Sequence, residues 1–357
     1  MNDKVLSIHY LRGIAGLFVV LFHFRGYLNN VYAQSDLGQI LFNSGAFGVD
    51  LFFMISGFII ALSTEKRTSK ISFAIRRFFR IYPCFVVVFL IGVVFVYRFD
   101  PEENLLRGFF FIHRDYSEPA PGFGYNVLGP AWTLTYEIYF YTAFCAAMSI
   151  SHKYRTLISS IAILMIMFSL QMYFNGRVSL SGHFSAHVDE SNPAYGLLRF
   201  ISSPILFEFV VGMLFYELYK IGAFSLSKKT ATFTFFLCVG FFTTFYFSGK
   251  FFGFGVNKAG IISIALFIGF IVYGSSIGFK DNKTISFLGD ISFSIYISHY
   301  FFINMFNFYQ PDFYMQTTGI ARLCMMLTIT ISAGAILHLY VEKPFISIGK
   351  KLEKKLI

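Results

Sequence analysis

IHYLRGIAGLFVVLFHFRGYL, residues 8–28, is the stretch of sequence that decides the fold. A run of about 20 mostly apolar residues is long enough to cross the hydrocarbon core of a bilayer as a helix. Nine further blocks of this kind follow, and we expect helices over residues 45–63, 81–98, 131–150, 154–174, 200–219, 230–248, 258–277, 285–308 and 318–340. The sequence therefore predicts an all-α polytopic membrane protein, a bundle of about ten transmembrane helices.

The composition supports this interpretation. Hydrophobic residues make up 56 % of the 357 residues, and charged residues only 13 %, against about 25 % in soluble domains. Disorder, a fibre, a disulfide scaffold and an ordinary cytosolic enzyme are excluded. The net charge of +10 indicates basic loops beside anionic membrane lipid rather than a nucleic-acid partner. The four cysteines lack metal-ligand spacing, so we expect free thiols and no metal site.

Basic residues are unevenly divided between the two sets of loops. With the N-terminus placed inside, 19 of the 29 Lys and Arg residues fall in inside segments and 8 in outside segments. Cytoplasmic loops carry an excess of Lys and Arg, so both termini are expected in the cytoplasm. We expect one membrane domain, residues 1–345, and a short basic cytoplasmic tail, residues 346–357.

Two ionisable residues of the first span lie on one helix face. Arg12 and His23 are eleven residues apart, which is three turns plus about 20°, and about 16 Å along the axis. Ionisable groups at membrane depth usually mark function. We interpret the face as the lining of a passage, with an anion site at Arg12 and a proton-transfer group at His23. The alternative is an interfacial arginine and a structural histidine.

Two carboxylates are expected at the depth of His23. Asp50 begins the second span and Glu137 the fourth, and all three residues should lie about 7–10 Å below the outer surface. A carboxylate beside an imidazole raises its basicity and fixes its tautomer. The sequence leaves open which acid faces His23, and a structural buried ion pair is the alternative.

A basic stretch follows the second span. Residues 64–80 are expected to lie on the membrane surface before the chain turns into the third span at Pro83. Arg76, Arg77 and Arg80 share a helical face there. They are candidates for binding phosphates, and lipid contact is the alternative.

Two other polar segments within the predicted spans are interpreted as helix–helix contacts. Ser56-Gly57-Phe58 is expected to let helices approach closely rather than to supply a nucleophile. His299 in the ninth span is interpreted as a hydrogen-bonding residue between helices.

With these residues placed, the chain resembles the membrane-bound acyltransferase-3 family, and in particular bacterial O-antigen and exopolysaccharide O-acetyltransferases. Four motifs carry the resemblance in order along nearly the whole chain. They are the arginine and histidine of residues 7–23, GVDLFFMISGF at 48–58, RRFFRIYP at 76–83, and the tryptophan–glutamate segment at 132–141.

The resemblance implies acetyl transfer from cytoplasmic acetyl-CoA to a sugar hydroxyl on the outer side. It implies that Arg12 and His23 are essential and that the basic stretch lies near the CoA phosphates. Two departures matter. Only a short tail follows the last span, where many relatives append a hydrolase-like domain. The ninth-span motif reads His299-Tyr300-Phe301 where relatives have histidine–tryptophan–proline.

These observations combine into a mechanism. We expect His23 to act as general base on the acceptor hydroxyl with help from Glu137 or Asp50, a covalent acetyl-histidine being the second possibility. Acetyl-CoA is expected as a donor rather than as a permanently bound cofactor. The acceptor is expected to be a lipid-linked or nascent glycan. Trp132 and Tyr136 are candidates for binding it, with an interfacial aromatic belt as the alternative. The expected location is a bacterial inner membrane, and no oligomeric state is predicted.

Two rival functions remain. A secondary transporter or glycan flippase also needs charges inside the membrane, but it predicts inverted repeats with broken helices, and no repeat is evident in the sequence. An inactive scaffold or sensor is the other rival, and the histidine–carboxylate set argues against it.

Overall fold

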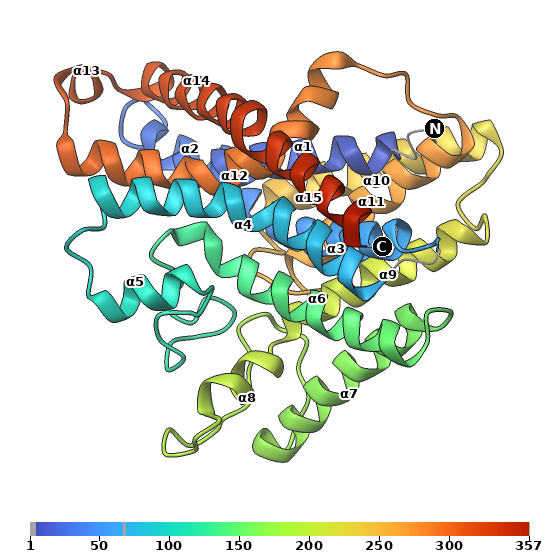
Figure 1. Cartoon of the computed structure of the whole chain (residues 1–357). Helices are drawn as coiled ribbons and strands as arrows, with labels where there is room; N and C mark the ends of the chain where they lie inside the picture. Colours follow the sequence, from blue (N-terminus) through green and yellow to red (C-terminus); the bar gives the residue numbers. More distant parts are fainter. Residues whose placement is uncertain (1–4, 67–68, 357) are drawn as a thin grey trace. The chain divides into compact units, whose positions relative to one another are not determined.

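The structure is a computed structural model that describes residues 5–66 and 69–356, and every regular element in those residues is a helix (Figure 1). The α-helices are α1 (Leu6–Phe24), α2 (Leu37–Phe42), α3 (Phe47–Ser63), α4 (Lys70–Phe95), α5 (Glu102–Phe109), α6 (Trp132–Ile150), α7 (Arg155–Asn175), α8 (Tyr195–Ile201), α9 (Phe207–Lys220), α10 (Lys228–Ser248), α11 (Ala259–Ser276), α12 (Lys283–Tyr309), α13 (Asp312–Met315), α14 (Gly319–Leu337) and α15 (Lys343–Leu356). A short π-helical segment, His338–Glu342, joins α14 to α15.

Each of the ten ranges predicted to cross the membrane contains a helix. Seven stretches of the described chain are long and apolar enough to span a bilayer, and α8 with α9 forms an eighth if this pair, bent by 43°, is one span. The other two predicted ranges hold α6 and α12, which carry Glu137 and His299. The polytopic helical class is therefore established, while the count of ten spans and the side of the termini stay predictions.

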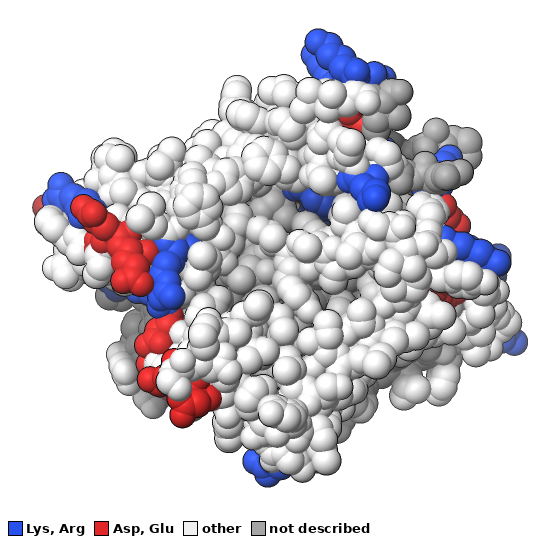
Figure 2. Space-filling view, turned by 60° about the horizontal axis from the view of Figure 1, so that its bottom comes forward, with Lys and Arg blue, Asp and Glu red and all other residues white. Residues whose placement is uncertain are grey.

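Large apolar side chains cover much of the surface, as expected where helices face lipid. On α10, for example, Phe233 and Phe236 are 68 % and 66 % exposed. Figure 2 shows one face of the molecule on which acidic and basic side chains are sparse and gather mainly toward the margins. A soluble protein would not leave this much aromatic surface in water.

The predicted turn at Pro83 is wrong. Helix α4 runs without a break from Lys70 to Phe95 with Pro83 inside it. The helix begins early because Ser69 caps it, its hydroxyl accepting a hydrogen bond of 3.1 Å from the Ser72 amide. Proline removes one backbone hydrogen bond, which membrane helices tolerate when their surroundings satisfy the freed carbonyl. Residues 70–80 of the basic stretch and residues 81–95 of the third span are thus one helix, and residues 67–68 of the stretch lie outside the described part of the chain.

The chain divides into two compact units, and the division falls within α3. The first unit holds the described residues up to Ile55 together with Glu217–His338. In it α1 and α12 run parallel, because contacts to α12 advance along the chain as those from α1 do: His9 to Ser286, Arg12 to Ser292, and His23 to His299.

Glycines allow α1 and α12 to approach closely. A Cβ atom added at Gly13 would lie 2.9 Å from the Gly289 nitrogen, and one at Gly289 would lie 2.5 Å from the His9 carbonyl oxygen. Parallel membrane helices start on the same side, so an odd number of crossings must separate them. The seven crossings predicted between α1 and α12 meet this condition.

The second unit comprises Ser56–Tyr216 and Leu339–Ile357, of which the last residue lies outside the described part. Its helices also pack through a glycine. A Cβ at Gly57 of α3 would lie 2.2 Å from the Phe209 carbonyl oxygen of α9. The expected close approach of helices at Ser56-Gly57-Phe58 is therefore confirmed. Beside it, the rings of Phe140 and Phe209 stack at 4.4 Å.

A buried histidine lies in the connection between α5 and α6. His113 has no exposed surface, and the rings of Tyr116, Phe123, Tyr136 and Phe200 lie 5.5–5.7 Å from its own. Its Nε2 atom is buried without a hydrogen-bond partner among the described residues. This burial lowers the pKa of His113 from 6.5 to about 3. The folded protein therefore keeps this imidazole neutral at pH values where an unfolded chain would protonate it.

We expect His113→Phe to weaken the acid sensitivity of the fold. The folded-state pKa lies below the unfolded-state value, so the unfolded chain binds more protons below pH 6.5. Stability from the neutral ring is fully present above pH 6.5 and is lost at up to about 1.4 kcal/mol per pH unit toward pH 3. Thermal unfolding in detergent between pH 7.5 and 4 measures this: the wild-type melting temperature should fall more steeply than that of the variant.

The matched control is His187→Asn, since His187 is an exposed histidine in the same unit. In this variant the melting temperature should fall with pH as steeply as it does in the wild type. Equal slopes for wild type and His113→Phe would show that His113 does not titrate on unfolding.

Candidate active site

The first unit places two histidine side chains in contact at the interface of α1 and α12. Nε2 of His299 lies 3.2 Å from Nδ1 of His23, and the ring centroids are 4.9 Å apart. His299 is fully buried, whereas His23 is half-buried. The interpretation of His299 as a hydrogen-bonding residue between helices is therefore confirmed.

Backbone carbonyls orient both rings. Nδ1 of His23 lies 2.9 Å from the Val19 carbonyl oxygen, one turn back on α1. Nδ1 of His299 lies 2.7 Å from the Tyr296 carbonyl oxygen on α12. Aromatic edges complete the setting, because the ring of Tyr300 lies 5.3 Å from that of His23. The imidazole of His23 is thus held in a defined orientation.

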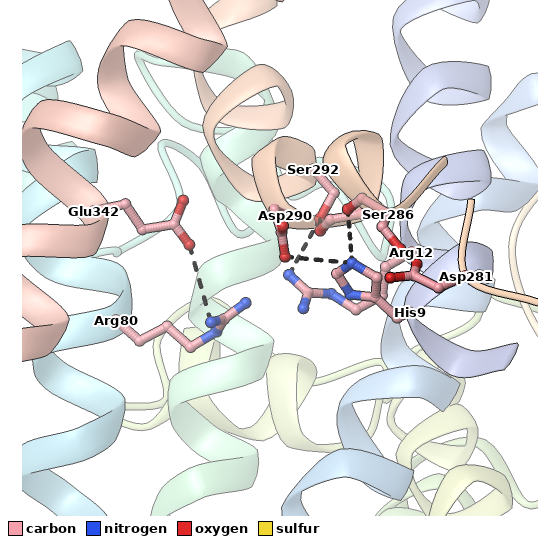
Figure 3. A network of polar contacts seen from close by, with 9 residues as sticks. His9, Arg12, Arg80, Asp281, Ser286, Asp290, Ser292 and Glu342 are labelled. Carbon is pink, nitrogen blue, oxygen red and sulfur yellow. Dashed lines mark hydrogen bonds and ion pairs between the residues drawn. The ribbon is translucent and has the colours of Figure 1, made fainter. Parts of the chain in front are cut away.

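Arg12 lies further down the same helix pair. Its guanidinium donates a hydrogen bond of 3.1 Å to the Ser292 hydroxyl of α12. Close by, Nε2 of His9 lies 2.7 Å from the Ser286 carbonyl oxygen and 3.3 Å from the Asp290 carboxylate. Figure 3 shows these α1 side chains pointing at α12. Arg12 and His23 therefore both face α12, as expected of one helix face.

Asp50, one of the two carboxylates considered for the neighbourhood of His23, bonds to a backbone amide. It is fully buried in the first turn of α3, and its carboxylate accepts a hydrogen bond of 2.8 Å from the Gly255 amide. The hydrogen bonds described for His23 go to Val19 and His299, not to Asp50. In this arrangement Asp50 fixes the segment before α11. Its part in catalysis stays a prediction.

In the second unit, Glu137 is part of a small polar group. Its carboxylate accepts a hydrogen bond of 3.1 Å from the Ser56 hydroxyl and another from the Tyr141 hydroxyl. The Arg77 guanidinium lies 5.7 Å from the ring centroid of Tyr141. Tyr141 therefore connects a predicted catalytic carboxylate with one of the predicted phosphate-binding arginines, a link that sequence spacing did not reveal.

The three arginines of α4 each have a partner. Arg76 forms a bidentate ion pair with Glu353 of α15. Arg77 donates a hydrogen bond of 2.7 Å to the Ser63 hydroxyl. The Arg80 guanidinium lies 3.9 Å from the carboxylate of Glu342, which is buried. Figure 3 also shows this pair. Residues 346–356 of the segment expected as a basic tail are thus part of α15, which contacts this cluster, with Gly349 packed on Phe79.

The two residues predicted to bind the acceptor are buried aromatics. Tyr136 is fully buried and donates a hydrogen bond of 3.0 Å to the Pro121 carbonyl oxygen. Trp132 is 5 % exposed, and its ring lies 5.8 Å from that of Tyr136. The ring of Trp132 also lies 6.2 Å from that of Tyr125, so both side chains hold the connection between α5 and α6 against α6. Their role toward an acceptor stays a prediction.

Comparisons with known proteins identify the family of the chain. The acyltransferase-3 family model, described as an acyltransferase domain, matches residues 5–339. The "Exopolysaccharide production protein ExoZ" of Rhizobium meliloti (strain 1021) is 26 % identical over 273 residues, covering 74 % of this chain and 78 % of that protein. "Acyltransferase MdmB" of Streptomyces mycarofaciens is 30 % identical over 152 residues, covering 40 % of this chain and 38 % of that protein. No solved structure matches the chain.

Proposed function

The chain belongs to the acyltransferase-3 family, and we propose that it is an O-acetyltransferase acting on a cell-surface glycan. It is a multi-pass membrane acyltransferase that transfers groups other than aminoacyl groups. The proposed donor is cytoplasmic acetyl-CoA. The proposed acceptor is a hydroxyl of an O-antigen, capsule or exopolysaccharide, carried on a lipid at the outer face of a bacterial inner membrane. The similarity to a protein named for exopolysaccharide production favours a glycan.

The observation that carries the proposal is the half-buried imidazole of His23, held by Val19 and His299 on a membrane helix. Acyl transfer from a thioester to an alcohol needs a base for the hydroxyl proton. In the proposed reaction His23 takes that proton as the oxygen forms its bond to the acyl carbon. The carbon–sulfur bond then breaks, and the CoA thiolate recovers the proton from the imidazolium, so no proton is gained or lost overall.

Other residues are assigned to binding and support. Arg76, Arg77 and Arg80 are proposed to lie near the CoA phosphates, since guanidinium groups bind phosphates through paired hydrogen bonds. Arg12 is proposed to attract an anionic part of the donor. Glu137, or Asp50, is proposed to support the charge that develops near the reacting atoms.

A transfer assay on membranes tests the proposal. Membranes from expressing cells receive radiolabelled acetyl-CoA with or without a lipid-linked glycan. The expected result is label in the glycan fraction that mild base releases as acetate, because esters are base-labile. Membranes that transfer label to no glycan acceptor would contradict the proposed substrate, and transfer from other acyl-CoAs but not acetyl-CoA would contradict the proposed donor.

We expect Glu353→Gln to improve the use of the donor. The Glu353 carboxylate occupies Arg76, so it competes with any phosphate for that guanidinium. An exposed ion pair contributes about 0.2–1 kcal/mol, and the Michaelis constant for acetyl-CoA should therefore fall about 1.5- to 5-fold, with kcat unchanged. Initial rates at varied acetyl-CoA measure this.

Glu102→Gln provides the control, because Glu102 is an exposed glutamate on α5. It should leave the Michaelis constant as it is. An unchanged constant in Glu353→Gln would indicate that Arg76 does not hold the donor.

A further inference from the structure

The contact between His23 and His299 determines where the protons of both rings lie. A backbone carbonyl can only accept a hydrogen bond. The Tyr296 carbonyl oxygen lies 2.7 Å from Nδ1 of His299, and the Val19 carbonyl oxygen lies 2.9 Å from Nδ1 of His23. Each ring must therefore carry its proton on Nδ1 to satisfy these contacts. In a neutral imidazole the other nitrogen, Nε2, then has the free lone pair.

This assignment makes the contact between the rings complementary. The N–H of His23 at Nδ1 faces Nε2 of His299 at 3.2 Å, and that atom has a lone pair to accept it. The proton at Nδ1 of His23 is thus shared between the Val19 carbonyl and His299. The opposite tautomer of His23 would set a lone pair on Nδ1 against both of these acceptors, which is repulsive.

His299 is well suited to hold this position. Its ring is fully buried, and it packs against the rings of Phe24 and Tyr296. Two carbonyls of its own helix, those of Ile295 and Tyr296, receive its N–H. Aromatic packing and local hydrogen bonds therefore prevent the ring from turning away from α1.

We propose that His299 is a positioning residue for acyl transfer: by accepting the N–H at Nδ1 of His23, it makes Nε2 of His23 the atom that removes the acceptor's proton. The proposal rests on the proposed function. When Nε2 takes the proton, the imidazolium keeps a hydrogen bond from Nδ1 to a neutral ring. This arrangement parallels the orienting carboxylate of a catalytic triad, where a wrong tautomer lowers kcat about 10⁴-fold. Because His299 is uncharged, we expect a smaller effect, of about 10²-fold.

Two variants at this position separate positioning from packing. His299→Leu keeps an apolar side chain but cannot accept a hydrogen bond, and its kcat should fall about 100-fold with the Michaelis constant for acetyl-CoA unchanged. His299→Gln places a carbonyl oxygen near the position of Nε2 and should recover kcat to within about tenfold of wild type. A purely structural role would lower the amount of folded protein in both variants and leave no difference between them.

Ser298→Ala is the matched control on α12, because the Ser298 hydroxyl bonds only to Ser294 of its own helix among the contacts described for it. It should retain wild-type kinetics. All variants are compared at equal amounts of monodisperse protein in detergent.

A second measurement does not depend on activity. Solid-state nitrogen NMR of the membrane-embedded protein labelled at histidine, with His23→Gln for assignment, reports which ring nitrogen of His23 carries the proton. We expect Nδ1 in wild type and a mixture of tautomers in His299→Leu. A proton on Nε2 of His23 in wild type would overturn the inference. Full activity in His299→Leu would overturn it while leaving the proposed function intact, and an inactive wild type with the expected tautomer would contradict only the proposed function.

Discussion

His23→Gln is expected to abolish nearly all acyl transfer while leaving the protein folded in the membrane. General-base catalysis contributes about 10²–10⁴-fold, and kcat/KM should fall by this factor because glutamine cannot take a proton. The ring is half-buried, so its loss should cost little packing. Transfer of radiolabelled acetyl groups, normalised to protein in the membrane, measures the effect.

His187→Gln is the control for His23, since His187 is an exposed histidine outside the site; it should retain wild-type rates. Near-normal transfer by His23→Gln would remove His23 from the mechanism. A second experiment with His187→Gln and His23→Gln distinguishes a general base from a nucleophile at His23. Each protein is incubated with acetyl-CoA in the absence of acceptor and then analysed by mass spectrometry. If His23 acts as a base, His187→Gln should carry no acetyl group on His23 and should match His23→Gln.

Gly57→Val is expected to prevent stable folding of the second unit. A Cβ at this position would lie 2.2 Å from the Phe209 carbonyl oxygen, and a backbone atom cannot move aside as a flexible side chain can. Overpacking typically costs about 1–3 kcal/mol and sometimes more, and a clash with backbone belongs at or above the upper end. Because Trp132 is the single tryptophan and lies in this unit, its fluorescence during heating in detergent reports the unfolding.

Gly240→Ala is the control for Gly57, because a Cβ at Gly240 of α10 would meet nothing within 4 Å. Alanine favours the helix by up to about 1 kcal/mol over glycine, so the melting temperature should stay the same or rise slightly. A wild-type melting curve for Gly57→Val would show that α3 and α9 do not pack as described.

Local features of the sequence were predicted well, because they depend on neighbouring residues. Apolar blocks of about 20 residues located the helices, and a small residue in an apolar helix indicated the contact at Gly57. The turn at Pro83 was predicted wrongly because proline was weighed without the cap at Ser69. That cap starts the helix before proline is reached.

Pairings between distant segments could not be predicted from local patterns. His23 and His299 are 276 residues apart, and no periodicity connects them. The topology offered one usable signal: the first and ninth predicted spans start on the same side, and both carry polar residues. For the same reason the ion pair of Arg76 with Glu353 was missed, since the tail was judged by its charge alone.

The pairing of α1 with α12 means that the first helix is synthesised long before the helix on which it packs. The first helix is synthesised with Arg12 and His23, yet their partners on α12 are made 280 and 276 residues later, which takes about 14 to 56 s at ~5–20 residues per second. During that interval α12 is absent, so the insertion machinery must keep the Arg12 guanidinium and the His23 imidazole away from lipid. Nascent chains arrested before α12 should accordingly be favoured targets for membrane quality-control proteases.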